Sequence, residues 1–306
     1  MSDGFKVVTL TSFDNSNLVT YEWKPASAAK GVVLIVHGMC EHAKRYNEFA
    51  ISLNKQGLIV FAFDLRGHGL TAGSPEAVCK YPDGQNIFAD SVKDICFLAD
   101  MLIEKYRLPL CVLGHSYGSF LTQGFMQNYN KHACVVLSGS AFMRDAQTML
   151  GGVVAGVTKA FCGGDAKAKT IFKLSFGAYG KGFKGSSWLT RDNTIAKEYR
   201  EDEYCGACPS ANFYKGFFKG LNKVTQSGEL AKIKQDIPVL ITSGSRDPVG
   251  GKNISLVYKL NEKYKKAGLS AVELKVWEDA RHEILNETNR REIQAHITGF
   301  ILKNMA

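Results

Sequence analysis

A serine between two glycines, Gly114-His115-Ser116-Tyr117-Gly118, is the part of this sequence whose residue types most directly suggest chemistry. It follows a short apolar run at residues 110–113 and precedes a helix-like segment at 119–130. A Gly-x-Ser-x-Gly between strand and helix is typical of a sharp turn that exposes the serine hydroxyl at the carboxyl edge of a sheet. Glycines on either side remove the side chains that would clash in such a turn. The pattern predicts that Ser116 is a nucleophile.

A serine nucleophile needs a general base, and the base needs a group that orients it. In a turn of this kind the chain order is serine, then an acid, then histidine. Asp247 follows a strand expected at 237–243, and His282 follows one expected at 271–277. Parallel strands end at the same edge of a sheet, so these side chains are expected to meet Ser116 there. We predict that His282 takes the proton of Ser116 and that Asp247 orients the imidazole.

Two other carboxylates, Glu278 and Asp279, are rival acids for this role. Both lie on the loop that carries His282, after the wrong strand, so Asp247 is favoured.

Acyl transfer through a serine also needs donors for the oxyanion of the tetrahedral intermediate. The Tyr117 amide, directly after the nucleophile, is one expected donor. The other is expected from the loop at 37–42, with the Met39 amide as first choice and Cys40 as the alternative. The histidines of that loop, His37 and His42, are interpreted as structural hydrogen-bonding residues.

Alternation of apolar strands and amphipathic helices indicates the elements that position these groups. Strands are expected at 5–11, 18–24, 31–36, 58–63, 110–113, 134–137, 237–243 and 271–277, and helices at 43–56, 86–106, 119–130, 252–267 and 287–304. This order favours an α/β fold with a doubly wound, mostly parallel sheet. The alternation stops between residues 141 and 235. We therefore expect a core from 1–140 and 236–306, and a mainly helical cap (lid) insertion at 141–235 over the carboxyl ends of the strands.

Aromatic residues recur at helical spacing inside the expected cap, at Phe213, Tyr214, Phe217 and Phe218. They can pack on the top of the sheet or line an acyl pocket, and the sequence leaves both open. Phe213, Phe217 and Val154 are the candidate substrate contacts. The uncharged, glycine-containing stretch 146–158 is interpreted as a mobile lid that touches lipid.

Composition narrows the classes of partner. The 306 residues carry a net charge of +9, with no nucleic-acid-reading motif beside it, so no nucleic-acid partner is expected. Basic residues interleaved with aromatics at 211–223 favour transient contact of the cap with an anionic membrane surface. No obligate protein partner is indicated. The start of the chain lacks a signal-peptide pattern, and no apolar run approaches the roughly 20 residues of a membrane span, so a cytoplasmic location is expected.

Cys205 and Cys208 have the spacing of half a zinc knuckle or of a redox pair. A structural zinc needs four ligands, and no second pair lies nearby in the sequence, so no metal is expected. The segment 64–69 is interpreted as a rigid turn rather than a phosphate or metal site.

Several motifs together carry a resemblance to a known family. They are His37-Gly-Met-Cys-Glu-His-Ala-Lys-Arg-Tyr46, Asp64-Leu-Arg-Gly-His-Gly69, Gly114-His-Ser-Tyr-Gly118, Ser243-Gly-Ser-Arg-Asp-Pro248 and Ala280-Arg-His-Glu283. The chain resembles the monoacylglycerol lipase and lysophospholipase group of α/β-hydrolases, among the serine aminopeptidase S33-type hydrolases. The resemblance implies a serine ester hydrolase without cofactors, acting on lipid-like or small esters, and the same roles for Ser116, Asp247, His282, Met39 and Tyr117. Ser119 stands where family members often have glycine, and the cap shows no strong match.

Two other functions remain open from the sequence. An aminopeptidase or amide hydrolase of the same fold would need cap carboxylates, such as Glu201, Asp202 or Glu203, to hold a substrate ammonium group. A non-catalytic ligand-binding protein of this fold is the other alternative.

Overall fold

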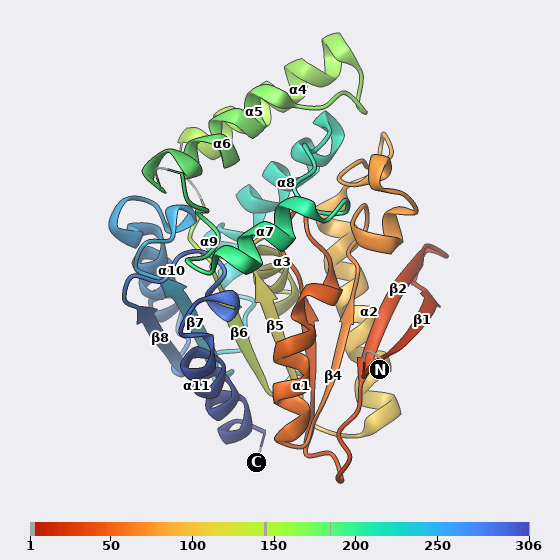
Figure 1. Cartoon of the computed structure of the whole chain (residues 1–306), viewed down its shortest axis with the longest axis vertical. Helices are drawn as coiled ribbons and strands as arrows, with labels where there is room; N and C mark the ends of the chain where they lie inside the picture. The colour runs from red at the N-terminus through yellow and green to blue at the C-terminus, as the bar shows by residue number, and fades with distance from the viewer. Residues whose placement is uncertain (1–3, 144–145, 184, 306) are drawn as a thin grey trace.

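One mixed sheet of eight strands forms the centre of the molecule (Figure 1). The computed structural model describes residues 4–143, 146–183 and 185–305. The strand order is β1-β2-β4-β3-β5-β6-β7-β8, with antiparallel pairing from β1 to β4 and parallel pairing from β4 to β8. The strands are β1 (Lys6–Thr11), β2 (Asn17–Trp23), β3 (Gly31–Val36), β4 (Leu58–Phe63), β5 (Leu110–His115), β6 (Cys134–Ser138), β7 (Val239–Gly244) and β8 (Val272–Trp277).

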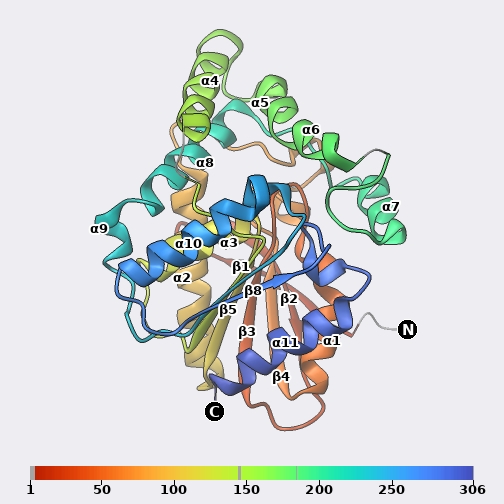
Figure 2. The same ribbon diagram turned by 90° about the vertical axis from the view of Figure 1, so that its left-hand side faces the viewer.

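Helices cover both faces of this sheet (Figure 2). One face carries α1 (Asn47–Lys55) and α11 (Arg290–Lys303), and the other carries α2 (Ile87–Tyr106), α3 (Tyr117–Met126) and α10 (Ser255–Lys266). Every residue of β3 to β7 is buried. Such strands are nearly all apolar because a parallel sheet hides both faces. The predicted doubly wound, mostly parallel α/β sheet is confirmed.

Several predicted helix boundaries were wrong. The helix expected from residue 119 begins at Tyr117, directly after the serine, and ends at Met126. The helix expected at 252–267 begins only at Ser255, because Asn253 and Ile254 adopt left-handed backbone conformations with φ of 52° and 49°. The first turn expected at 43–46 is a 3₁₀ turn, and α11 starts at Arg290 rather than 287.

Residues 141–235, expected as the cap, form helices and contain no named strand in their described part. These helices are α4 (Ala146–Cys162), α5 (Lys169–Leu174), α6 (Phe176–Tyr179), α7 (Asn193–Glu201), α8 (Ala211–Val224) and α9 (Ser227–Leu230). α4 packs along α8, and α8 contacts α2 and α3. Figure 1 shows α4 to α6 as an outer layer above α8 and the sheet. Among the helices of the described segments, none has the length and apolar character that crossing a bilayer requires.

Candidate active site

The turn between β5 and α3 holds Ser116 in a strained conformation, with φ 53° and ψ −118°. Glycine is required on both sides of it. A β-carbon on Gly118 would lie 2.1 Å from the carbonyl oxygen of Val36, and one on Gly114 would lie 2.5 Å from that of Gly118. The backbone of β3 therefore passes so close to the turn that no side chain fits between them. Strain of this kind persists only where surrounding structure imposes it, and it marks a functional site.

Ser116, His282 and Asp247 lie in one hydrogen-bonded line. The Ser116 Oγ is 2.8 Å from the His282 Nε2, and the His282 Nδ1 is 2.9 Å from both carboxylate oxygens of Asp247. Asp247 also accepts hydrogen bonds from the Val249 amide and the Ser243 hydroxyl. With the proton of the imidazole on Nδ1, Nε2 is free to accept the hydroxyl proton of Ser116. The structure thus brings together the three side chains that the sequence singled out.

The two rival acids do not take part in this line. Glu278 and Asp279 are exposed, and Glu278 accepts a hydrogen bond from the Ser245 hydroxyl on the surface.

Burial and charge oppose each other at His282. Burial alone would lower its pKa, but the negative charge of Asp247 and the hydrogen bond to it raise the pKa above its ordinary value. Burial likewise tends to raise the pKa of Asp247, and His282 together with the Val249 amide lowers it. The ring of His115 lies 4.8 Å from that of His282, and burial first, then the neighbouring His282, lowers the pKa of His115 to about 4. His115 is therefore neutral at physiological pH and adds no charge against a protonated His282.

Two residues contribute free amides beside Ser116. Neither the Met39 nor the Tyr117 backbone N–H has an acceptor within the described part of the chain, and both residues line the same cavity as Ser116. Free amides beside a nucleophile suit an oxyanion hole, and this role stays a prediction for both. Cys40, the alternative donor, has a positive φ of 58°, and its carbonyl accepts hydrogen bonds from the Gly206 amide and the Tyr199 hydroxyl of the cap.

A charged network fixes the loop that carries Met39. Glu41 accepts hydrogen bonds from the Gly38 amide at 2.6 Å and from the Tyr46 hydroxyl at 2.9 Å. Arg45 joins Glu41 to Glu283, to which it donates two hydrogen bonds. Burial would raise the pKa of Glu283, but Arg45 lowers it to about 2, so this carboxylate stays charged. Glu41, Arg45 and Glu283 all occur in the motifs of the sequence, but nothing in the sequence indicated that they interact.

A cavity of about 80 Å³ lies against Ser116. Its walls are mostly aromatic and apolar, and they contain no carboxylate among the lining residues. They are Met39, Ser116, Tyr117, Phe120, Met143, Ser175, Phe176, Tyr179, Trp188, Tyr214, Phe217, Phe218 and Val249. Pockets that hold small ligands usually measure about 300–1,000 Å³, so this volume accommodates only a small part of a long acyl chain.

Only one of the three predicted substrate contacts lines this cavity. Phe217 lines it, but Phe213 and Val154 do not. Phe213 is one helical turn before Phe217, and its fully buried ring packs 5.6 Å from that of His68 and 5.5 Å from that of Tyr117. Val154 packs half-buried against the hydrophobic core from α4. For these two residues the structure indicates packing rather than substrate contact.

Besides Phe120 of α3, three lining aromatics of the cap were missed by the sequence analysis: Phe176, Tyr179 and Trp188. The Trp188 ring lies 5.1 Å from that of His282, so it covers the base from the cap side. Their only signal was the density of aromatic residues in a stretch without periodicity.

The remaining motif residues have structural partners. The His37 Nε2 accepts a hydrogen bond from the Leu65 amide, and His42 pairs with Asp202. Arg66 forms ion pairs with Asp94 and Asp14, which agrees with a rigid turn at 64–69.

Comparison with known proteins adds to this geometry. Residues 27–289 match the family model described as serine aminopeptidase, S33. A monoacylglycerol lipase from Mycolicibacterium smegmatis is 26% identical over 290 residues, covering 92% of each chain. The monoglyceride lipase of Homo sapiens is 27% identical over 282 residues, covering 91% of this chain and 84% of its own. The crystal structure of a thermostable carboxyl esterase from Bacillus coagulans superimposes with a TM-score of 0.89 at 23% identity, over 99% of both chains. That last likeness shows a shared α/β-hydrolase fold.

Proposed function

This chain belongs to the serine aminopeptidase, S33 family, and we propose that it cleaves monoacylglycerol-like or lysophospholipid-like esters with Ser116 as nucleophile. Its relatives and structural neighbours include monoacylglycerol lipases and a carboxyl esterase, and the chain is a serine ester hydrolase. The observation that carries the choice of substrate is the apolar, aromatic cavity that opens directly on the Ser116 hydroxyl.

The hydrogen-bonded line supports acyl transfer in two steps. His282 accepts the Ser116 proton as the hydroxyl attacks the ester carbonyl, and the Met39 and Tyr117 amides stabilise the oxyanion. His282 then gives the proton to the leaving alcohol, which leaves an acyl group on Ser116. A water molecule gives a proton to His282 as it attacks this acyl-enzyme, and His282 then gives that proton to the Ser116 Oγ as the carboxylic acid is released. Asp247 stabilises the imidazolium formed in each step.

The cap carboxylates do not favour the aminopeptidase alternative. Glu201 and Glu203 are exposed, and Asp202 is paired with His42 at 2.8 Å. None of these three lines the cavity at Ser116, so a substrate ammonium would meet no counter-charge there. The aligned triad also argues against a non-catalytic binding protein, because such a role does not require it.

A panel of substrates separates these possibilities. We expect p-nitrophenyl acyl esters and monoacylglycerols to be hydrolysed, with kcat/KM rising from short to medium acyl chains because each added methylene is buried against aromatic walls. Amino-acid arylamides should react far more slowly. Faster cleavage of arylamides than of every ester would reverse the assignment.

An exposed apolar stripe on α4 supports a lipid-derived substrate. Met149, Val153, Val157 and Phe161 recur every four residues on one side of the helix, and Phe161 is 86% exposed. Contiguous exposed apolar patches of this kind mark contact with lipid or protein. We assign the stripe to a lipid surface, because α4 lies in the outer layer of the cap, packed on α8, whose Phe217 and Phe218 line the cavity (Figure 1).

Replacing Val157 and Phe161 together by serine is expected to reduce hydrolysis of monoacylglycerol in micelles or vesicles by about tenfold, since two large apolar contacts worth roughly 1–2 kcal/mol in total are lost. Hydrolysis of dissolved p-nitrophenyl butyrate should change little. Initial rates on both substrates, with vesicle sedimentation as a binding assay, provide the measurement. Equal losses on both substrates would contradict a role for α4 at lipid surfaces.

A further inference from the structure

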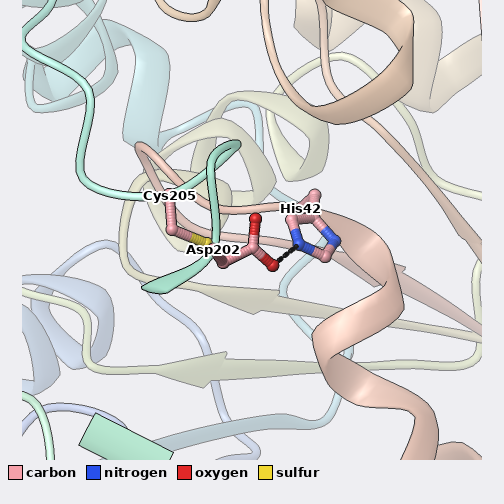
Figure 3. Close-up of side chains that lie close together, drawn as sticks. All are labelled: His42, Asp202 and Cys205. Atoms are coloured by element: carbon pink, nitrogen blue, oxygen red, sulfur yellow. Dashed lines mark hydrogen bonds and ion pairs between the residues drawn. The ribbon is translucent and has the colours of Figure 1, made fainter. Parts of the chain in front are cut away.

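Three side chains of different chemical type converge at the junction of the loop 37–42 and the cap (Figure 3). His42 ends the loop, Asp202 follows α7 directly, and Cys205 lies in the connection to α8. Their potential ligand atoms all lie within 4.8 Å of one another, and the His42 Nε2 is 2.8 Å from the Asp202 Oδ2. All three are partly exposed, so an ion can reach them from solvent.

We propose that His42, Asp202 and Cys205 form a binding site for a zinc ion. An imidazole nitrogen, a carboxylate oxygen and a thiolate sulfur are the three donor types that Zn²⁺ accepts in proteins. Three protein ligands with water as the fourth complete a tetrahedral shell. Zinc–ligand bonds of about 2.0–2.3 Å place the ligand atoms roughly 3.3–3.6 Å apart, so side-chain shifts of about 1 Å close the site.

Proton release accompanies metal binding. The Cys205 thiol gives its proton to solvent as the sulfur–zinc bond forms. The His42 imidazole must present the lone pair of Nε2, so its proton resides on Nδ1 and the hydrogen bond to Asp202 is replaced by two bonds to zinc. No oxidation or reduction takes place.

The charges around the site favour a divalent cation. The charges of Asp202, Glu41 and Glu283 act on the Cys205 thiol, and so does Arg45, which is itself paired with Glu41 and Glu283. Three carboxylates against one guanidinium leave an excess of negative charge, which attracts Zn²⁺ and compensates for its loss of water.

This ligand set differs from the one that the Cys205 and Cys208 spacing suggested. Cys208 is not a member of the group, and its Sγ lies 3.9 Å from the carbonyl oxygen of Pro209. The histidine comes instead from a segment 160 residues away along the chain, and the sequence offered no pattern that joins the two.

A bound zinc ion would tie the cap to the loop that carries Met39. The two segments already meet through hydrogen bonds from the Gly206 amide to the Cys40 carbonyl and from the Cys40 thiol to the Ala207 carbonyl. Coordination adds a bridge at the same junction. Because binding favours the folded chain, Zn²⁺ should raise the thermal midpoint in a concentration-dependent manner.

Calorimetric titration of the reduced, chelator-treated chain with Zn²⁺ tests the site, with Cys205→Ser as the variant and Cys208→Ser as the matched control. We expect one zinc ion per chain, an affinity at least about tenfold lower in Cys205→Ser, since even loss of an outer-shell partner costs that much, and no change in Cys208→Ser. Titration with Co²⁺ should give a thiolate-to-metal charge-transfer band that Cys205→Ser lacks.

Asp202→Asn serves as a second variant if Cys205→Ser does not fold, as judged by its metal-free circular dichroism. The proposal is wrong if the parent chain binds no zinc, if Cys205→Ser and Asp202→Asn bind it as tightly as the parent, or if Cys208→Ser loses as much affinity as Cys205→Ser. None of these readouts depends on ester hydrolysis, so failure of the zinc site and failure of the proposed enzyme function are distinguishable.

Discussion

Replacing Ser116 by alanine is expected to lower kcat for ester hydrolysis by about 10⁶-fold, the loss seen when the nucleophile of a serine triad is removed. In the proposed mechanism the Ser116 Oγ forms the acyl-enzyme, and it is held 2.8 Å from the His282 Nε2. Without the Ser116 hydroxyl, His282 has no nucleophile to deprotonate. A water molecule would have to attack the ester directly, from a position that the site does not fix. Steady-state kinetics on p-nitrophenyl butyrate, with burst-phase analysis, measures the effect.

Ser119 provides the control for this variant. It is buried one helical turn further on, and its hydroxyl donates to the Ser116 carbonyl at 2.6 Å. Loss of one neutral hydrogen bond, about 1 kcal/mol, should change kcat in Ser119→Ala by less than about tenfold. If Ser116→Ala kept the activity of Ser119→Ala, another nucleophile would have to carry the reaction.

Replacing Asp247 by asparagine is expected to lower kcat/KM by about 10⁴-fold, because the amide stabilises the wrong imidazole tautomer and cannot stabilise the imidazolium. The pH dependence gives a second signature. His282 must be neutral to act as a base, and Asp247 raises the pKa of His282 above its usual value of 6.5. In the parent chain, activity should therefore appear only as pH rises through that elevated pKa.

Without the Asp247 charge, burial lowers the pKa of His282 and is opposed only by the weaker charge effects of Glu283 and Glu41 among the main influences. The residual activity of Asp247→Asn should accordingly extend to lower pH than that of the parent. Glu278→Gln, which changes an exposed carboxylate on the His282 loop, should keep the parent profile. If the acidic side of the pH–activity profile of Asp247→Asn stayed in place or moved to higher pH, the proposed pairing of Asp247 with His282 would be contradicted.

The sequence predicted the sheet and the three aligned side chains because each has a local cause. The central parallel strands are continuous apolar runs, and Ser116 directly follows one of them. Asp247 lies on the loop after β7, and His282 lies on the loop after the edge strand β8, which carries Glu273 and Lys275 among apolar residues. Their meeting at one edge follows from parallel pairing of β5, β6, β7 and β8. The helix that starts at Ser255 was predicted to start at residue 252. The two left-handed residues before Ser255 do not change the spacing of apolar residues, so the sequence did not reveal the later start.

The cavity and the cap junction could not be predicted in the same way. Trp188 reaches His282 from an irregular segment, and Phe213 turns into the core although it has the same helical spacing as Phe217. Which side of α8 faces the substrate depends on how that helix packs against α2 and α3, which no local pattern encodes. The pairing of Arg45 with Glu283 could not be predicted either, because these residues lie 238 positions apart in the sequence.

Mapping a fluorophosphonate adduct by peptide mass spectrometry tests most directly whether Ser116 is the nucleophile of this ester hydrolase. The parent chain should take up one phosphonyl group per molecule on the peptide that contains Ser116, with loss of esterase activity in proportion to labelling. Ser116→Ala should take up none. An adduct on another residue, or full esterase activity in a chain labelled at Ser116, would contradict the proposed mechanism.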